Sequence, residues 1–501
     1  MLSSLTAISE NGSAFIPPPL PLRRLLVMKF GGTSMGSAER MRAAAAIIAH
    51  ERVQRPLVVV VSAMSGVTDL LLETLRRAEL GDSGGLESSL HRLLRLHLET
   101  CQDLFHETPA SVQFRQEAFT DIQSLVAEFR RIANGILMLG ERPPRSVDEA
   151  AAVGERLSSA LMAHYLASIG VDARPINGSH VIITDAVFGN AYPHMEPTRI
   201  QCAERLSPLL ERGTVPVVTG FNGATIDGRP TTLGRGGSDL SASIVAAAMD
   251  AQELWIWTDV DGIMTADPRL VKDVTVLNEL SYAEAAELAH HGAKILHPRT
   301  LAPLVEKQIP VWSKNSFAPE KPGTKIAPSI RDAGGARAVT SMSNVALLSM
   351  VSANAALSGT RLMARALDAL ALRNVEILVL TSSSYRQSFS FLIRKHDLGT
   401  ALEALGANLS IELAHGYLKP IEVDEDTALL AVIGEDMRGR PGLAGRVFTA
   451  IAREDVNIIA IAQGSSELTI GVVVRLDGLA RAVRAVHDEV ISPKVPAASV
   501  A

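Results

Sequence analysis

Several features that would restrict the function of this sequence are scarce or missing. The 501 residues include only two cysteines, Cys101 and Cys202. Two are too few for a disulfide framework or a thiolate metal site, and they favour a reducing, cytoplasmic environment. No apolar run approaches the roughly 20 residues that a helix needs to cross a bilayer. The net charge of −6 gives no reason to expect nucleic acid or an anionic membrane as a partner.

The start of the chain also lacks the charged beginning and apolar core of a secretory signal. Residues 1–24 instead carry serine, glycine and the proline cluster Pro17–Pro21. We interpret this segment as a disordered leader, or as a start codon assigned too early. Met28 lies too deep in the first predicted strand to be an obvious alternative start.

The composition is that of a compact protein with large buried surfaces. Hydrophobic residues make up 47% of the chain and charged residues 20%. A chain of this length is expected to form two to four domains.

From residue 25 to about 318 the pattern alternates short apolar strands with helices. The predicted strands are Leu25–Phe30, Leu57–Ser62, Val215–Thr219, Glu253–Trp257 and Ile309–Ser313, and the clearest helices are Ala38–His50, Val67–Ala78 and Ser238–Met249. Such alternation predicts an α/β fold with an open, mainly parallel sheet covered by helices on both faces. Residues 86–139 have an almost purely helical pattern and look like an insertion.

A different organisation follows. Residues 319–336, rich in Pro, Gly and charge, predict a linker. An internal repeat comes next: Arg365 corresponds to Arg446 and Val375 to Val456, so the copies lie 81 residues apart. Each copy predicts a strand, a helix and two further strands joined by a serine-rich turn. We therefore expect two regulatory α+β units, at 337–418 and 419–494.

The first candidate site is the segment Lys29–Ser34, which reads KFGGTS at the end of the opening strand. Glycines allow close approach of the backbone to an anion, and the lysine supplies positive charge where a phosphoryl group moves. The spacing is not that of a P-loop. An ordinary glycine turn with a solvated lysine is the alternative.

The second is Thr232–Ser241, TLGRGGSDLS, which enters a predicted helix. Arg235 can bind a carboxylate through two hydrogen bonds. Asp239 lies in the first helical turn, where capping or compensation of the helix dipole is the alternative role. An arginine among three glycines has no obvious structural purpose.

Further candidates lie at other strand ends and helix starts. Trp257–Arg269 follows a buried strand, at the edge where open α/β sheets bind ligands. Its Asp259 and Asp261 do not have the spacing of a calcium loop. Lys294 is a nucleotide-site candidate or a helix-end lysine. The segments Ser62–Asp69 and Gly154–Ser158 either hold the ammonium and carboxylate of an amino acid or serve as caps. The adjacent His290 and His291 cannot share a helical face and receive no role.

Together these segments resemble the aspartate kinase branch of the amino acid kinase family, in the family's order, from about Leu25 to about Val490. The motifs are Lys29–Ser34, Val61–Asp69, Gly154–Ser158, Leu233–Asp239, Trp257–Gly262 and Gly292–Pro298. The C-terminal repeat resembles the paired ACT domains of these kinases, of βαββαβ type, which bind amino acid end products. The resemblance places the catalytic domain at 25–318.

The resemblance also implies roles for individual residues. Lys29, Gly31 and Gly32 would lie at the transferring phosphate, and Asp239 would order the reacting groups. Arg235 would bind the α-carboxylate of aspartate and Glu155 its ammonium group. The remaining residues would assist the substrate (Ser62, Thr68 and Ser238) or hold the nucleotide (Thr258, Asp259, Met264, Arg269 and Lys294).

Some positions depart from the family pattern. Met264 stands where the family often has tyrosine. In the repeat, Gln463 has Ser382 as its counterpart and Glu467 has Arg386. The chain resembles the kinase half of bifunctional aspartate kinase–homoserine dehydrogenases, yet no dehydrogenase sequence follows.

The implied reaction transfers a phosphoryl group from ATP to the β-carboxylate of L-aspartate. That carboxylate has a reference pKa of about 3.9 and is ionised at neutral pH, so no general base is needed. Mg²⁺ on ATP would be held mainly by phosphates and water, and we name no protein ligand. The expected effector is threonine or lysine, in a homodimer or larger assembly. A kinase with another acidic substrate and a non-catalytic amino acid sensor remain as alternatives.

Overall fold

The computed structural model describes residues 24–105, 109–293, 296, 298–330, 335–353, 359–383, 388–437, 439–464 and 466–491. Outside these ranges lie residues 1–23 of the predicted leader, the counterpart residue Arg386 and the nucleotide-site candidate Lys294. The chain divides into two compact units, one up to Trp255 and one from Ile256. This division falls within the predicted catalytic domain.

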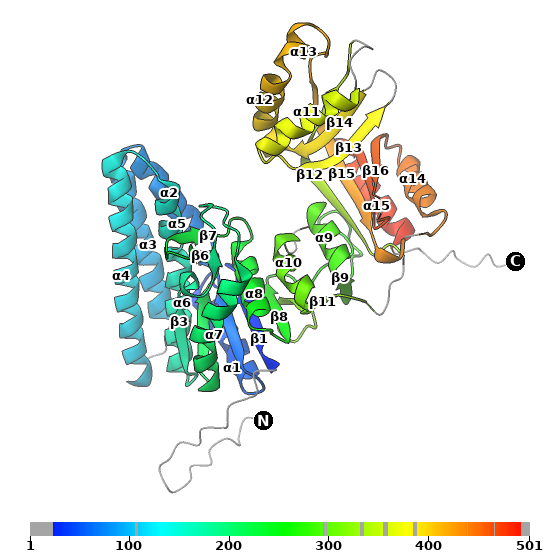
Figure 1. Cartoon of the computed structure of the whole chain (residues 1–501). Coiled ribbons are helices and arrows are strands. Elements are labelled where there is room, and N and C mark those ends of the chain that lie inside the picture. The colour runs from blue at the N-terminus through cyan, green and yellow to red at the C-terminus, as the bar shows by residue number, and fades with distance from the viewer. Residues whose placement is uncertain are drawn as a thin grey trace, which may run out of the picture. The chain divides into compact units, whose positions relative to one another are not determined.

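The first unit contains the opening strands and the long helices, coloured blue to green in Figure 1. Its elements are β1 (Leu26–Phe30), α1 (Ala38–Arg52), β2 (Leu57–Val61), α2 (Val67–Glu79), α3 (Ser83–Leu104), α4 (Pro109–Leu139), α5 (Pro144–Ala151), α6 (Val153–Ser168), β3 (Ala173–Ile176), η2 (Gly178–His180), β4 (Ile183–Thr184), α7 (Met195–Glu211), β5 (Val215–Thr219), β6 (Asn222–Thr225), β7 (Pro230–Thr232) and α8 (Gly237–Ala248), and β8 (Glu253–Thr258) crosses the boundary.

The main sheet of this unit has the order β3-β5-β2-β1-β8. The pairs β1–β2, β2–β5 and β3–β5 are parallel. Every residue of β1 and β2 is buried, as their continuous apolar sequences predicted. Helices α6 and α8 pack against these strands. The predicted parallel, helix-covered sheet is therefore confirmed.

The expected insertion is a pair of long helices, α3 and α4, which pack together. Both carry an apolar stripe, with Leu86, Leu90 and Leu93 buried on α3. Asp82 caps α3 by accepting a hydrogen bond from Gly85 N at 2.8 Å.

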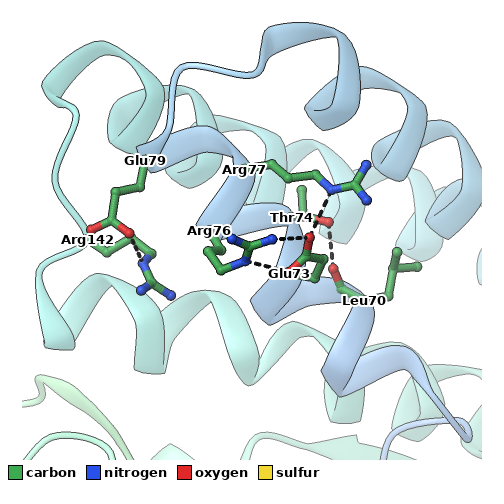
Figure 2. A network of polar contacts seen from close by, with 7 residues as sticks. All are labelled: Leu70, Glu73, Thr74, Arg76, Arg77, Glu79 and Arg142. Carbon is green, nitrogen blue, oxygen red and sulfur yellow. Dashed lines mark hydrogen bonds and ion pairs between the residues drawn. The ribbon is translucent and has the colours of Figure 1, made fainter.

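A polar network lies along helix α2 toward its C-terminal end (Figure 2). Arg142, which precedes α5, donates a hydrogen bond to Glu79 at 2.8 Å. Hydrogen bonds from Arg76 and Arg77 lower the pKa of Glu73 to about 2. The network consists of Leu70, Glu73, Thr74, Arg76, Arg77, Glu79 and Arg142. It joins the end of α2 to the segment that leads into α5.

The second unit begins with the last strands and helices of the predicted catalytic domain and continues through the repeat. Its elements are β9 (Glu279–Ser281), α9 (Tyr282–His290), α10 (Pro298–Lys307), β10 (Val311–Asn315), β11 (Thr324–Ala327), β12 (Ala338–Met350), α11 (Gly359–Leu372), β13 (Ile377–Ser383), β14 (Ser388–Arg394), η4 (Lys395–Asp397), α12 (Leu398–Asn408), α13 (Ser410–Ala414), β15 (Glu422–Ile433), η5 (Glu435–Met437), α14 (Leu443–Arg453), β16 (Ile458–Gln463), β17 (Thr469–Arg475), η6 (Leu476–Gly478) and α15 (Leu479–Val490).

The repeat folds into one six-stranded sheet with the order β13-β14-β12-β15-β17-β16. Its paired strands are antiparallel. Each copy reads strand, helix, strand, strand, helix, so the 81-residue repeat is confirmed as two α+β units. After the second helix of the first copy come the short helix α13 and then β15, which also opens the second copy. The long strands β12 and β15 pair with each other and join the copies.

No helix in the described ranges is both long enough and apolar enough to cross a membrane.

Candidate active site

The strand-end lysine predicted from the sequence is buried and paired. Lys29 is only 8% exposed because it lies in β1 among buried neighbours. Its Nζ atom is 2.6 Å from Oδ1 of Asp239, in the first turn of α8. Asp239 does not cap α8, since the N-cap residue is Gly236. The alternatives of a solvated lysine and a capping aspartate are therefore wrong, whereas Asp239 does lie in the first helical turn, where a carboxylate also compensates the helix dipole.

The glycine-rich loop before α8 requires its glycines. Gly234 and Gly236 have φ values of 75° and 70°, a region that side chains with a Cβ rarely adopt. A Cβ on Gly237 would lie 2.7 Å from the ring of Phe221. The backbone N–H of Phe221 donates to Ser241 Oγ at 2.9 Å. These contacts restrict the backbone conformation of the loop, in which Arg235 is exposed.

The beginning of this loop is held by a carboxylate that the sequence analysis did not single out. Asp148, on α5, is 2% exposed. It accepts three hydrogen bonds of 2.8 Å, from the backbone N–H groups of Gly189 and Thr232 and from Thr232 Oγ1. Burial raises the pKa of Asp148, and these three bonds oppose the rise.

Glu155 lies in the first turn of α6 and is 3% exposed. The backbone N–H groups of Ala63 and of Glu155 itself act to lower its pKa. Its Oε2 atom has no hydrogen-bond partner among the described residues. Burial raises the pKa of this carboxyl to about 8, against the opposing effect of the Lys29 charge. The close packing of Gly154 against Ala63, where a Cβ would lie 2.9 Å from the alanine Cβ, brings this turn against the end of β2.

One pocket with a volume of about 510 Å³ is lined by Lys29, Glu155, Arg235 and Asp239, and Asp148 lies outside its lining. The structure brings together eight residues that the sequence predicted: Lys29, Gly32, Ser62, Thr68, Glu155, Arg235, Ser238 and Asp239. Gly31 precedes Gly32 but does not line the pocket. Asp69, Ser65 and Phe221 line it as well and were not predicted as site residues. Asp69 and Ser65 could have been found, since they lie inside the Val61–Asp69 motif.

Arg235 lines the pocket without a partner. Its guanidinium forms no hydrogen bond or ion pair with the other described residues of the chain. The pocket thus offers an exposed cation, a buried carboxyl and a buried lysine–aspartate pair. This set suits a small molecule with both a carboxylate and an ammonium group.

The predicted nucleotide residues Thr258, Asp259, Met264 and Arg269 belong to the second unit, whereas Lys294 lies outside the described residues. Met264 and Arg269 line a second pocket of about 300 Å³, together with residues 339–341 of β12. Arg269 is paired with Asp267, its Nη2 atom 2.6 Å from Oδ2. Thr258 Oγ1 donates to Asp259 at 3.1 Å, and neither residue lines this pocket.

The second copy of the repeat contains a third pocket, again of about 300 Å³. Gln463, Glu467 and Arg440 line it. Gly439 N donates to Glu467 Oε2 at 2.7 Å, which ties the loop before α14 to the turn after β16. The counterpart Ser382 is exposed at the end of β13.

Comparison with known proteins agrees with this arrangement. Residues 24–315 match the amino acid kinase family, and residues 430–490 match an ACT domain. The chain is 34% identical to bifunctional aspartokinase/homoserine dehydrogenase 1 of Arabidopsis thaliana over 92% of its length, covering 50% of that protein. The chain thus spans about half the length of the first curated relatives that it matches.

Two matches extend along almost the whole of a relative. Lysine-sensitive aspartokinase 3 of Escherichia coli is 31% identical, over 93% of this chain and 99% of that protein. The crystal structure of E. coli aspartokinase III with aspartate and ADP superposes with a TM-score of 0.78 at 30% identity, covering 93% of this chain and 99% of that one. The family match over more than half of the chain and the full-length relative lead to one conclusion: this protein belongs to the amino acid kinase family.

Proposed function

We propose that this protein is an aspartate kinase, which transfers the γ-phosphoryl group of ATP to the β-carboxylate of L-aspartate. The observation that carries the proposal is the Lys29–Asp239 pair in one pocket with Arg235 and Glu155. In that pocket, Lys29 can bind a phosphoryl group, while Arg235 and Glu155 can bind the carboxylate and the ammonium group of an amino acid. The similarity to aspartokinase III, whose structure holds aspartate and ADP, supports the same substrate.

Aspartate would be held at both of its α-groups. Arg235 can receive the α-carboxylate through two parallel hydrogen bonds. The free Oε2 of Glu155 can accept a hydrogen bond from the α-ammonium group. We assign assisting contacts to Ser62, Thr68 and Ser238, whose side chains belong to the same pocket lining. The β-carboxylate then extends toward Lys29.

The chemistry requires two anions to be brought together. A β-carboxylate oxygen attacks the γ-phosphorus, the bond to the bridging oxygen breaks, and ADP leaves with the electron pair. Lys29 and the backbone N–H groups at Gly31 and Gly32 would offset the charge that develops. Asp239 would hold the Lys29 ammonium in place.

ATP is expected to bring Mg²⁺, which prefers oxygen ligands and usually keeps phosphates and water around it. The carboxylates of Asp69 and Asp239 in the pocket lining fit that chemistry. We assign neither of them as a ligand. For the nucleotide itself we propose contacts with Thr258, Asp259, Met264, Arg269 and Lys294.

The repeat is proposed to be the regulatory part, with ACT domains at 337–418 and 419–494, joined by a 319–336 linker to a catalytic domain at 25–318. We propose lysine or threonine as its effector. The similarity to a lysine-sensitive aspartokinase supports lysine, and the similarity to the bifunctional kinase–dehydrogenases supports threonine. A cytoplasmic homodimer or larger assembly, which supplies precursors of lysine, threonine and methionine, completes the proposal.

One assay tests the substrate directly. ATP consumption is measured with aspartate, glutamate and N-acetylglutamate, and hydroxylamine traps any acyl phosphate as a hydroxamate. Turnover and hydroxamate are expected with aspartate alone. Turnover with a different acid would assign another amino acid kinase. ATP consumption with none of the three, with effector binding retained, would indicate a sensor.

A further inference from the structure

Asp148 is a buried carboxylate, 2% exposed, that the proposed reaction does not use. It lies outside the pocket lining, and its two oxygens are occupied by Gly189 and Thr232. Burying a carboxylate without an opposite charge beside it costs free energy, so we expect Asp148 to have a specific role. The two residues that donate to it, Gly189 and Thr232, indicate what that role is.

Thr232 is the last residue of β7 and the first of the glycine-rich loop. Its carbonyl oxygen accepts from Ala191 N at 2.9 Å, and the next residue, Leu233, donates to Phe221 O at 2.8 Å. Asp148 therefore fixes the strand end from which the loop departs, within three residues of Arg235.

Gly189 brings a second segment to the same carboxylate. Gly189 and Asn190 lie directly against Gly234: a Cβ there would be 2.7 Å from Asn190 Oδ1 and 3.2 Å from Gly189 O. By accepting from Gly189 N, Asp148 Oδ2 positions this segment against the loop. Asp148 thus holds both sides of the turn at Gly234, whose φ is 75°.

We propose that Asp148 is a positioning residue for the substrate, which sets the place of the Arg235 guanidinium through Thr232, Gly189 and Gly234. The inference rests on the proposed role of Arg235 as the carboxylate-binding residue. A change at Asp148 should therefore affect chiefly aspartate recognition. The loop that carries Arg235 begins at Thr232, whereas Lys29 belongs to β1.

The test compares four single variants and one double variant. Asp148→Ala removes all three acceptor bonds. Asp148→Asn keeps the shape, because the amide oxygen can accept from both backbone N–H groups and the amide nitrogen can donate to Thr232 Oγ1. Thr232→Val removes one bond and keeps the backbone N–H. Asp172→Ala is the control: Asp172 is an exposed carboxylate that accepts from Thr214 Oγ1 at 2.5 Å, and neither residue lines the pocket.

Asp148→Ala should raise the KM for aspartate about tenfold or more, with a smaller change in the KM for ATP. The KM of Asp148→Asn for aspartate should stay within about threefold of the wild-type value. The KM of the double variant Asp148→Ala/Thr232→Val for aspartate should be no higher than that of Asp148→Ala alone. Asp172→Ala should lower the melting temperature without changing either KM. Hydrogen exchange over residues 232–241 should be faster in Asp148→Ala, a readout that needs no turnover.

If folded Asp148→Ala keeps the wild-type KM for aspartate and wild-type exchange, the inference is wrong. If Asp148→Ala does not fold, an unchanged KM in Thr232→Val overturns it. Wild-type protein that turns over no aspartate contradicts the proposed function instead, and the exchange comparison still decides the role of Asp148.

Discussion

A lysine and a carboxylate 2.6 Å apart neutralise each other until a third charge arrives. In the proposed reaction, Lys29 would therefore be oriented before ATP binds, and the γ-phosphoryl group of ATP would become its second anionic partner. Orientation before binding is what makes such a cation effective, since no reorganisation is needed when charge develops.

Replacing either member of this pair should abolish most of the activity. Lys29→Ala and Asp239→Ala are each expected to lower kcat about 10²–10³-fold or more, because a preorganised charge at the phosphoryl group is lost. The check is steady-state kinetics on variants whose folding is verified by circular dichroism. Near-normal kcat in either folded variant would show that the active site lies elsewhere.

Arg235 should be needed for its shape as well as its charge. Arg235→Ala is expected to raise the KM for aspartate strongly, and Arg235→Lys should not rescue it, because an ammonium lacks the fork geometry. Calorimetric titration with aspartate measures the loss of affinity that underlies this rise in KM. Arg229→Ala, which removes an exposed partner of Asp227, is the control. Wild-type affinity in Arg235→Lys would rule out two-point binding.

The buried Glu155 should make aspartate binding depend on pH. Its pKa of about 8 means that the carboxyl is largely protonated at neutral pH in the free protein, so binding an ammonium group must release a proton. The KM for aspartate should therefore fall as pH rises from about 7 to about 9. Glu155→Gln should have a higher KM that no longer changes over this range. Glu149→Gln, outside the pocket lining, should keep the wild-type profile, and a KM independent of pH in wild type would contradict the expectation.

At the scale of elements, helix α9 connects two parts of the second unit. Its N-terminus forms a capping box between Ser281 and Glu284. Glu284 is fully buried, and its other oxygen accepts from Glu435 N at 2.9 Å. Glu435 begins η5, which leads into the loop that lines the pocket with Gln463. A structural change at that pocket can thus be transmitted to α9 through the side chain of Glu284.

Glu284→Ala should therefore weaken feedback inhibition. Losing the capping box and the bond to Glu435 should destabilise the fold by about 1–3 kcal/mol and raise the effector concentration for half inhibition severalfold. Ser281→Ala is the matched control, because it removes the cap but leaves the bond to Glu435. It should lower the melting temperature and keep the inhibition. Unchanged inhibition in folded Glu284→Ala would exclude this connection.

The elements show what the sequence could and could not predict. The apolar runs of β1 and β2 predicted the parallel sheet of the first unit, and the repeat predicted the sheet of the second half, because burial on both faces and internal repetition leave strong signals. The Lys29–Asp239 pair joins residues 210 positions apart, so only the folded chain brings them together. Asp148 was missed because a lone acid in a short helix resembles an ordinary surface residue. Its burial depends on loops that are distant in sequence.

At the scale of the whole molecule, binding at the repeat should oppose substrate binding. Effector inhibition requires a state that binds the effector better, typically by about 1–3 kcal/mol, and the coupling is reciprocal. Saturating aspartate and ATP should therefore weaken the binding of threonine or lysine, measured by calorimetry with both and with methionine. Gln463→Ala should abolish the binding, while Ser382→Ala should have no effect. If none of the three amino acids binds, the repeat does not serve as a feedback module.

The pairing of β12 with β15 has a consequence for biosynthesis. During translation, the first half of β12 cannot form its ladder with β15 until β15 leaves the ribosome, because Ala338–Met342 pair with residues 429–433 in the second copy. The exposed edge of this strand is a site where nascent chains can associate with one another. Ribosomes that pause between the two copies should therefore increase misassembly, whereas pauses after the second copy should not.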